Sequence, residues 1–200
     1  THPDSSAASD VYKRQGEKEM VSIDEGIRFD ASLESLSGLK TLSDDGVLTA
    51  GSSSQICDGA AAIMIVNDAG LEKLGLKPRA KIVSLALAGD DPVIMLTGPI
   101  PASKTVLEKA ELSIEDMDLY EVNEAFAPVP LAWAHELKAD KEKLNVNGGA
   151  MALGHPLGGT GAKLMTTLLH ELERREGKYG LQAICEGGGT ANALIIERLN

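Results

Sequence analysis

Apolar residues along this chain fall into short runs and helical stripes that alternate from residue 59 to the end. Short apolar runs bounded by turn residues predict buried strands over residues 59–66, 80–88, 114–122, 180–185 and 191–197. The segments between them predict helices over residues 68–75, 103–110, 124–137 and 161–175. Strands that alternate with helices predict an α/β fold, with helices on both faces of a sheet.

The last predicted helix has the strongest amphipathic pattern. Five residues make one apolar stripe along it: Leu164, Met165, Leu168, Leu169 and Leu172. Thr160 or a neighbouring glycine is expected to cap its start. In the helix over 124–137, Pro128 is easily accommodated, whereas Pro130 is expected to distort the second turn.

The first fifty residues show little periodicity. Residues 1–19 are polar and rich in Ser, Ala and Asp, and we interpret them as a disordered or artefactual lead-in that carries no chemistry. Residues 20–49 mix charges with sparse apolar residues and are interrupted by glycines. The continuous alternation of elements therefore lies in residues 50–200.

Composition narrows the class of function. The formal net charge of −11 argues against nucleic-acid and anionic-membrane partners, because both favour basic patches. The two cysteines do not form a secretory disulfide framework, and no apolar run approaches the ~20 residues that span a bilayer. We therefore expect a soluble cytoplasmic protein with a small-molecule substrate and no metal.

A glycine-rich segment over residues 145–161 surrounds His155 just before the last predicted helix. A phosphate-binding loop needs Lys directly after its final glycine, but Ala162 separates Gly161 from Lys163. The segment could also be a plain connection with a structural histidine. Sharp turns and close backbone approach are the physical uses of such glycines.

Two further clusters favour a catalytic interpretation. Asn-Glu-Ala-Phe-Ala occupies residues 123–127, and Cys-Glu-Gly-Gly-Gly occupies residues 185–189. With Gly-His-Pro at 154–156, these motifs stand in the order found in thiolases, the family that makes or cleaves 3-ketoacyl-CoA. From about residue 20 onward, the chain resembles the C-terminal part of a thiolase.

This resemblance implies a layered α-β-α-β-α sandwich, of which the chain would supply the C-terminal half with a mixed sheet. Residues 20–49 would be the end of the thiolase loop domain, and residues 50–200 the C-terminal domain. The motif with Glu186 is similar to that of thiolases acting on bulkier acyl groups, including bacterial enzymes of steroid side-chain degradation.

The resemblance also implies roles in a thioester Claisen condensation or its reverse. Cys185 would be the acid/base at the α-carbon of acetyl-CoA, with its pKa shifted toward neutrality by backbone N–H groups or a nearby imidazole. His155 would activate the nucleophilic cysteine and donate to the enolate oxygen. Asn123 would hold a water beside His155 in one oxyanion hole, and the Gly187 N–H would help to form another.

Ser54, Ala125 and Phe126 match the family positions that contact coenzyme A. Acyl-CoA and CoA would therefore be substrates, with no permanently bound cofactor. Cys57 takes the place of a non-catalytic polar residue, which favours a bystander thiol. The resemblance further implies a homodimer or homotetramer in lipid metabolism.

Neither Cys57 nor Cys185 matches the nucleophilic cysteine of the family, which lies in the N-terminal half. We therefore expect a fragment of an acetyl-CoA C-acyltransferase or C-acetyltransferase that is inactive alone. Related ketoacyl synthases are disfavoured because they use a second histidine at the position of Cys185. The alternative is a non-catalytic thiolase-like module that binds acyl-CoA or pairs with a partner subunit.

Overall fold

The computed structural model describes residues 10–14 and 17–199 and divides into two units, residues 1–39 and 40–200. In the first unit, strands β1 (Asp10–Arg14) and β2 (Glu17–Val21) pair antiparallel. Helix α1 (Leu33–Ser37) follows, with a capping box between Ser32 and Ser35. The expected disordered lead-in thus contains two strands where it is described, and its remaining residues lie outside the described ones. The boundaries proposed at residues 19 and 49 stay predictions.

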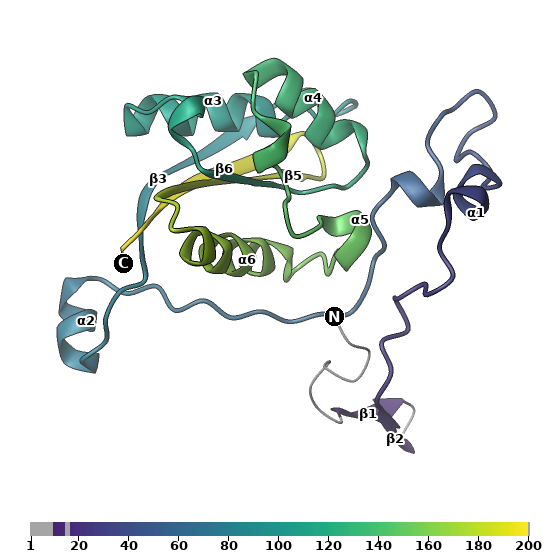
Figure 1. Cartoon of the computed structure of the whole chain (residues 1–200), viewed down its shortest axis with the longest axis horizontal. Helices are drawn as coiled ribbons and strands as arrows, with labels where there is room; N and C mark the ends of the chain where they lie inside the picture. Colours follow the sequence, from purple (N-terminus) through teal and green to yellow (C-terminus); the bar gives the residue numbers. More distant parts are fainter. Residues whose placement is uncertain (1–9, 15–16, 200) are drawn as a thin grey trace. The chain divides into compact units, whose positions relative to one another are not determined.

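The second unit is built on a four-stranded mixed sheet (Figure 1). Its strands are β3 (Ala80–Gly89), β4 (Leu119–Val122), β5 (Tyr179–Glu186) and β6 (Thr190–Arg198), in the order β3-β6-β5-β4. β6 is antiparallel to both of its neighbours, whereas β4 and β5 are parallel. The mixed sheet predicted from the sequence is therefore confirmed.

Helices cover both faces of this sheet. α3 (Pro99–Ala110) and α4 (Pro128–Leu137) lie on one face, and α6 (Thr160–Arg175) lies on the other (Figure 1). The shorter helices are α2 (Asp68–Leu74) and α5 (Ala150–Leu153). Single 3₁₀ turns occur at η2 (Ala50–Ser52), η3 (Ile114–Asp116) and η4 (Lys141–Lys143). Among the described residues, no helix combines the length and apolar character needed to cross a membrane.

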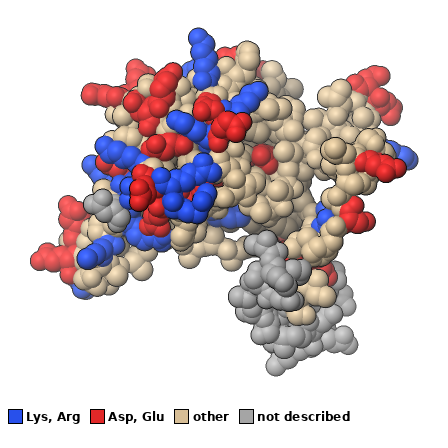
Figure 2. All heavy atoms as spheres, viewed as in Figure 1, with Lys and Arg blue, Asp and Glu red and all other residues tan. Residues whose placement is uncertain are grey.

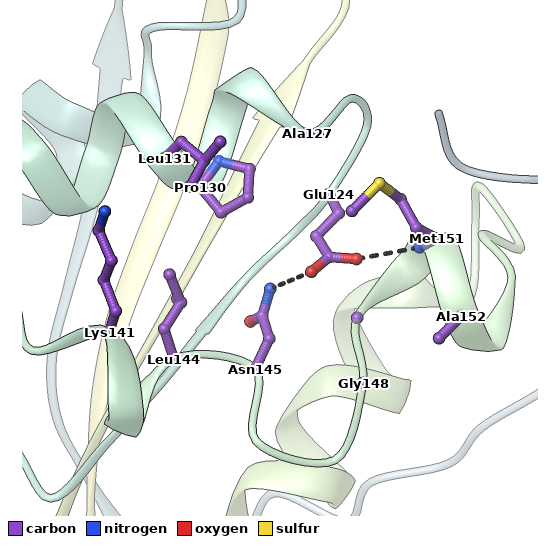
Figure 3. Close-up of a pocket in the computed structure, with 11 residues that line it drawn as sticks. Glu124, Ala127, Pro130, Leu131, Lys141, Leu144, Asn145, Gly148, Met151 and Ala152 are labelled. Carbon is purple, nitrogen blue, oxygen red and sulfur yellow. Dashed lines mark hydrogen bonds between the residues drawn. The ribbon is translucent and has the colours of Figure 1, made fainter. Parts of the chain in front are cut away.

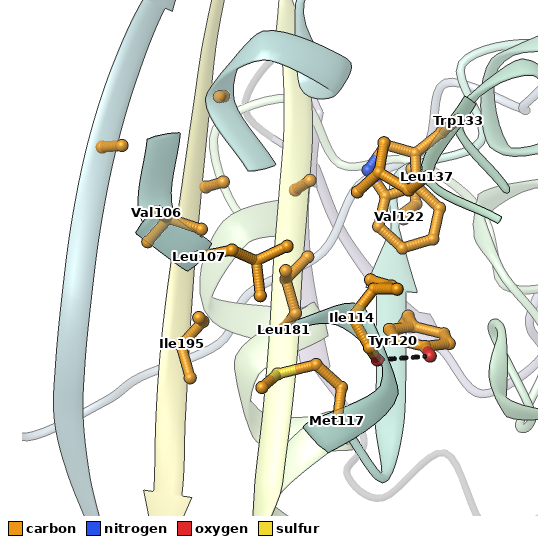
Figure 4. Close-up of a cluster of buried hydrophobic side chains, with 14 of the residues drawn as sticks. Val106, Leu107, Ile114, Met117, Tyr120, Val122, Trp133, Leu137, Leu181 and Ile195 are labelled. Atoms are coloured by element: carbon orange, nitrogen blue, oxygen red, sulfur yellow. Dashed lines mark hydrogen bonds between the residues drawn. The ribbon is translucent and has the colours of Figure 1, made fainter. Parts of the chain in front are cut away.

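The larger apolar core fills the space between the sheet and helices α3 and α4 (Figure 4). Trp133 packs edge-on against Tyr120, with ring centroids 5.3 Å apart. The polar atoms of both rings are satisfied, because Trp133 Nε1 donates to Ser103 Oγ at 2.8 Å and the Tyr120 hydroxyl donates to the Ile114 carbonyl at 3.0 Å. On the opposite face, a smaller core contains the predicted stripe residues Leu168 and Leu172.

Two helix starts differ from the sequence prediction. α3 begins at Pro99 rather than at residue 103, because proline suits the first helical position, where no N–H partner is needed. α4 begins at Pro128 rather than at residue 124, since the residues before it pair with another segment. Pro130 consequently falls in the first turn, where backbone N–H groups have no intrahelical acceptor, and the expected distortion of a second turn does not arise.

Two predicted strands also differ. Residues 114–116 form η3 rather than the start of a strand, because Asp116 accepts hydrogen bonds from the backbone N–H and hydroxyl of Ser113. Residues 59–66 form no strand, and Met64 and Ile65 are about 70% exposed. A strand needs a neighbour for its backbone hydrogen bonds, and no described segment pairs with this one.

Charged side chains of both signs lie close together on the visible face of the second unit (Figure 2). Arg79 forms a bidentate ion pair with Glu173, in which Nε donates to Oε1 at 2.8 Å and Nη2 donates to Oε2 at 2.6 Å. Buried Glu171 is paired with both Arg174 and Arg175, and these contacts lower its pKa to about 2. The charge on this face is therefore mixed rather than gathered into one basic patch.

Candidate functional site

An extended segment after η2 joins two of the sequence motifs. Ser53 forms an antiparallel bridge to Phe126, and both the backbone N–H and the hydroxyl of Ser54 donate to the Ala125 carbonyl, at 3.1 and 3.2 Å. Two residues after Ser54, Ile56 forms a parallel bridge to His155. The structure thus places Ser54 beside Ala125 and Phe126, the other predicted CoA-contacting residues, and the segment that carries Ser54 continues to His155.

The carboxyl ends of the parallel strands β4 and β5 bring together two other predicted residues. Asn123 directly follows β4, and its backbone N–H donates to the Ala183 carbonyl at 3.0 Å. Cys185 lies two residues further along β5. Both residues are therefore at the same edge of the sheet, which is where α/β folds commonly present ligand-binding groups.

His155 is held by Thr160, the first residue of α6. His155 Nδ1 lies 2.6 Å from Thr160 Oγ1, and Thr160 Oγ1 lies 2.9 Å from the Pro156 carbonyl. The hydroxyl has one proton and the carbonyl can only accept, so Thr160 donates to Pro156 and accepts from His155. This assigns the proton of the neutral ring to Nδ1 and leaves Nε2 free to accept a proton.

The charge state of His155 fits this assignment. Burial, followed by the positive charge of Lys163, lowers the pKa of His155 below its ordinary value. The ring is therefore neutral near pH 7, as a general base must be. Sequence reasoning expected Thr160 only as a helix cap. Its contact with an imidazole five residues earlier depends on the turn at Pro156, which spacing alone does not reveal.

Lys163 is a second residue that the sequence analysis did not place in the site. Its Nζ donates to the Gly154 carbonyl at 2.5 Å, directly before His155. Burial lowers the pKa of Lys163, and nearby Cys57, Glu121 and Glu124 act in the opposite direction. Gly154 has φ +82°, and a side chain there would meet Cys57 Sγ at 2.5 Å. Lys163 thus holds the backbone that presents the histidine, and the close approach of Cys57 leaves no room for a side chain at Gly154.

Cys185 differs from its predicted electrostatics. The resemblance implied a pKa shifted toward neutrality, but burial raises the pKa of the thiol. Glu186 adds to this rise, and a backbone hydrogen bond opposes it without reversing it. The thiol is only 9% exposed, so the ionised form loses most of its hydration. Cys185 is therefore protonated at rest, and once ionised it is a stronger base than an ordinary thiolate.

Gly187 lies in the turn that joins β5 and β6, immediately after Cys185 and Glu186. The Glu186 carboxylate accepts from Asn192 Nδ2 at 2.6 Å and from Thr190 Oγ1 at 3.2 Å, which ties the two strands together at the turn. No atom lies within 4 Å of where a side chain on Gly187 would begin. The space on the side-chain side of this glycine is therefore open.

Contacts at the start of α6 link the segment of His155 to the segment of Cys185. Thr160 contacts His155, and its neighbour Gly161 faces Ile184, with 3.5 Å between the Ile184 side chain and the position of a Cβ on the glycine. Ile184 immediately precedes Cys185. The start of α6 therefore connects the histidine motif to the end of β5 that carries the cysteine.

Glu124 has a structural position that its motif does not reveal. Its carboxylate accepts from Asn145 Nδ2 at 2.9 Å and from the Met151 N–H at 3.0 Å (Figure 3). It lines a hollow of about 400 Å³ between α4 and α5, to which neither His155 nor Cys185 contributes. A side chain on Gly149 would overlap this carboxylate. Glu124 therefore fastens the glycine-rich segment to the end of β4.

The fold and the three motifs define an α/β protein with a histidine and a cysteine at the carboxyl edge of its sheet. The family model described as the C-terminal domain of thiolase matches residues 76–198, and that of the N-terminal domain matches residues 9–69. The chain belongs to the thiolase family. The second match begins within the expected lead-in, which agrees with the strands found there.

Relatives with assigned names support this membership. Over 177 residues, the chain is 57% identical to the steroid 3-ketoacyl-CoA thiolase FadA6 of Mycobacterium tuberculosis, covering 88% of this chain and 43% of that protein. It is 47% identical to an acetyl-CoA acetyltransferase of Cupriavidus necator, covering 94% of this chain and 48% of the relative. The chain thus spans about half the length of the curated relatives it matches.

Solved structures give the same result. The crystal structure of the Bacillus anthracis acetyl-CoA acetyltransferase matches with a TM-score of 0.87 and 45% identity, over 94% of this chain and 48% of that one. Human mitochondrial 3-ketoacyl-CoA thiolase in complex with CoA matches with a TM-score of 0.82 and 44% identity, over 91% and 46% of the two chains. The predicted thiolase fold is therefore confirmed.

Proposed function

We propose that this chain is the C-terminal half of a thiolase that forms or cleaves 3-ketoacyl-CoA with acetyl-CoA by ping-pong Claisen chemistry. The contact between His155 and Thr160 carries the proposal, because it leaves Nε2 of a neutral imidazole as a proton acceptor. Such a base can activate a cysteine thiol for acyl transfer. By resemblance to the family, that cysteine would lie in an N-terminal half that precedes this chain.

In this mechanism each of the four proposed catalytic residues has a distinct role. His155 Nε2 takes the proton of the nucleophile and then, as imidazolium, donates to the oxyanion, with a water held by Asn123 as the second donor. Cys185, once ionised, removes the α-proton of acetyl-CoA in condensation and returns a proton in thiolysis. The raised pKa of its thiol supports this role, because a stronger base is better matched to a weakly acidic C–H. The Gly187 N–H donates to the acyl carbonyl.

The substrates would be acyl-CoA, acetyl-CoA and free CoA. Ser54, Ala125 and Phe126 lie together and match the family positions that contact CoA. The identity to a thiolase named for steroid substrates supports a bulky acyl group as one substrate class. We further propose a cytoplasmic homodimer or homotetramer without a resident metal or permanently bound cofactor.

Exposed apolar side chains support an upstream half as the missing partner. Leu85 and Leu87 are 56% and 77% exposed, and because they are two residues apart on the edge strand β3, they lie on the same face of that strand. Contiguous exposed apolar surface commonly marks an interaction site. The alternative, a non-catalytic module that binds acyl-CoA or pairs with a subunit, is favoured by one observation, since neither Cys57 nor Cys185 matches the family nucleophile.

Expression of the complete open reading frame that contains this chain tests the proposal. The purified product should cleave a 3-ketoacyl-CoA in the presence of CoA, whereas the 200-residue chain alone should not. CoA binding without turnover by the complete product would instead support the module.

A further inference from the structure

A buried polar pair lies on the sheet face that α6 covers. Glu121 on β4 and Gln182 on β5 are paired in the parallel register, and they are only 1% and 2% exposed. Leu119, two residues before Glu121, packs in the small core with Leu168 of α6. Gly161 of α6 faces Gln182, with 3.9 Å between the glutamine Nε2 and the position of a Cβ on the glycine. Both side chains therefore point beneath α6.

Each member of this pair has a buried oxygen without a partner. Glu121 Oε2 and Gln182 Oε1 are both fully enclosed, and neither makes a hydrogen bond within the described structure. Neighbouring strands lie about 5 Å apart, so side chains paired in register can reach each other. Two acceptor oxygens repel unless a proton lies between them, and a buried acceptor without a hydrogen bond destabilises the fold.

We propose that Glu121 carries a proton in the folded protein at neutral pH and donates it from Oε2 to Oε1 of Gln182. One proton then satisfies both unpartnered oxygens. It also avoids a bare carboxylate at a site that is almost wholly removed from water. The protonated pair is uncharged, and it lies next to Asn123, which follows Glu121 by two residues. The side-chain N and O atoms of Asn123 are likewise buried without a partner.

The charges around Glu121 favour the protonated form. Burial is the largest cause, and the acidic neighbours Glu124, just beyond β4, and Glu171, from α6, act in the same direction. Lys163, also from α6, opposes them. Gln182, from β5, is uncharged. The net effect raises the pKa of Glu121 to about 8.

This assignment gives Glu121 a positioning role that rests on the proposed function. Lys163 donates to the Gly154 carbonyl and so supports the backbone of His155. Ionisation of Glu121 above its pKa would release its proton to solvent and create a negative charge that attracts the Lys163 ammonium. That attraction competes with the Gly154 contact. The proton on Glu121 thereby keeps Lys163 available to hold the histidine segment.

Isotope-edited infrared spectroscopy tests the proton directly and needs no catalytic activity. In the complete protein with ¹³C-labelled glutamate, the difference between wild type and Glu121→Gln should contain a protonated-carboxyl band at pH 7. That band should disappear with a midpoint near pH 8. Glu171→Gln is the matched control, because Glu171 is also buried but paired with arginines, and its difference spectrum should contain only carboxylate bands at pH 7.

A carboxylate band for Glu121 at pH 7 would overturn the proposal. If Glu121→Gln does not fold, Gln182→Met provides the second test. Loss of the acceptor should shift the protonated-carboxyl band to higher frequency, and an unchanged band in that variant would contradict the pairing. In an active enzyme, Glu121→Gln should also remove a fall of kcat/KM with a midpoint near pH 8, which a purely structural glutamate would not control.

Discussion

The Thr160 hydroxyl accepts a hydrogen bond from His155 Nδ1 at 2.6 Å while it donates to the Pro156 carbonyl at 2.9 Å. The Pro156 carbonyl can only accept, so it takes the single hydroxyl proton of Thr160, and the proton between Thr160 and His155 must come from Nδ1. The backbone turn at Pro156 therefore fixes the histidine tautomer. The consequence is a free Nε2 on a partly buried, neutral ring.

Thr160→Val should weaken catalysis by the complete enzyme. Valine keeps the shape but removes a hydrogen bond that the imidazolium needs, and a bond to a charged group contributes about 1.5–3 kcal/mol. The expected loss in kcat is roughly 10- to 150-fold, with little change in KM. Thr166→Val is the matched control, because Thr166 lies on the same helix and donates only to the Ala162 carbonyl. Equal losses in the two variants would contradict the tautomer assignment.

Lys163→Met should lower kcat by disordering the backbone before His155. Methionine keeps most of the length of the lysine side chain but loses the Nζ contact to the Gly154 carbonyl. Lys109→Met removes a lysine contact to another backbone carbonyl, that of Leu85, at an exposed site on α3 outside the three motifs, and it should leave kcat unchanged. Steady-state kinetics on both variants measures the difference. A Lys163→Met enzyme with wild-type kcat would show that this lysine does not position the histidine.

Gly149→Ala should destabilise the fold by about 1–3 kcal/mol, the usual cost of overpacking. The added methyl group would overlap the Glu124 carboxylate, which accepts from Asn145 and Met151. Gly158→Ala is the control within the same glycine-rich segment, since nothing lies within 4 Å of its new methyl group. Denaturant unfolding should give a lower free energy of unfolding for Gly149→Ala than for Gly158→Ala. Equal values would contradict the role of Glu124 in holding the glycine-rich segment.

Acidification should cost the wild type more stability than it costs His155→Gln. Burial lowers the pKa of His155 in the folded state, so below the ordinary value of about 6.5 the unfolded chain binds a proton that the folded chain does not. As pH falls through that range, the free energy of unfolding should therefore decrease more for the wild type than for His155→Gln. A shift in the opposite direction would mean that the folded protein stabilises the imidazolium.

The sequence predicted those elements whose pattern is local. The leucine stripe of α6 and the apolar runs of β5 and β6 were all found, because each buries one continuous apolar surface. The strand over residues 59–66 was not found, since an apolar run becomes a strand only beside a partner. The start of α4 moved to Pro128 because the segment with Ser54 uses the preceding backbone.

The site was predictable as motifs but not as contacts. His155 and Cys185 stand out by the glycines beside them, and Asn123 stands out by the place of its motif in the order along the chain. Thr160 and Lys163 do not, because their roles depend on which backbone carbonyl the turn after Gly154 presents to them. The pairing of Glu121 with Gln182 depends on strand register, which no residue pattern specifies over a distance of sixty residues.

The central claim is a division of labour between His155 and Cys185. Trapping of the acyl-enzyme with labelled acyl-CoA tests it most directly in the complete protein, with condensation measured in parallel. Cys185→Ser should abolish condensation but leave acylation of the upstream cysteine nearly intact, because only condensation needs a proton removed from acetyl-CoA. His155→Ala should damage both steps. Equal loss of acylation in the two variants would contradict the account.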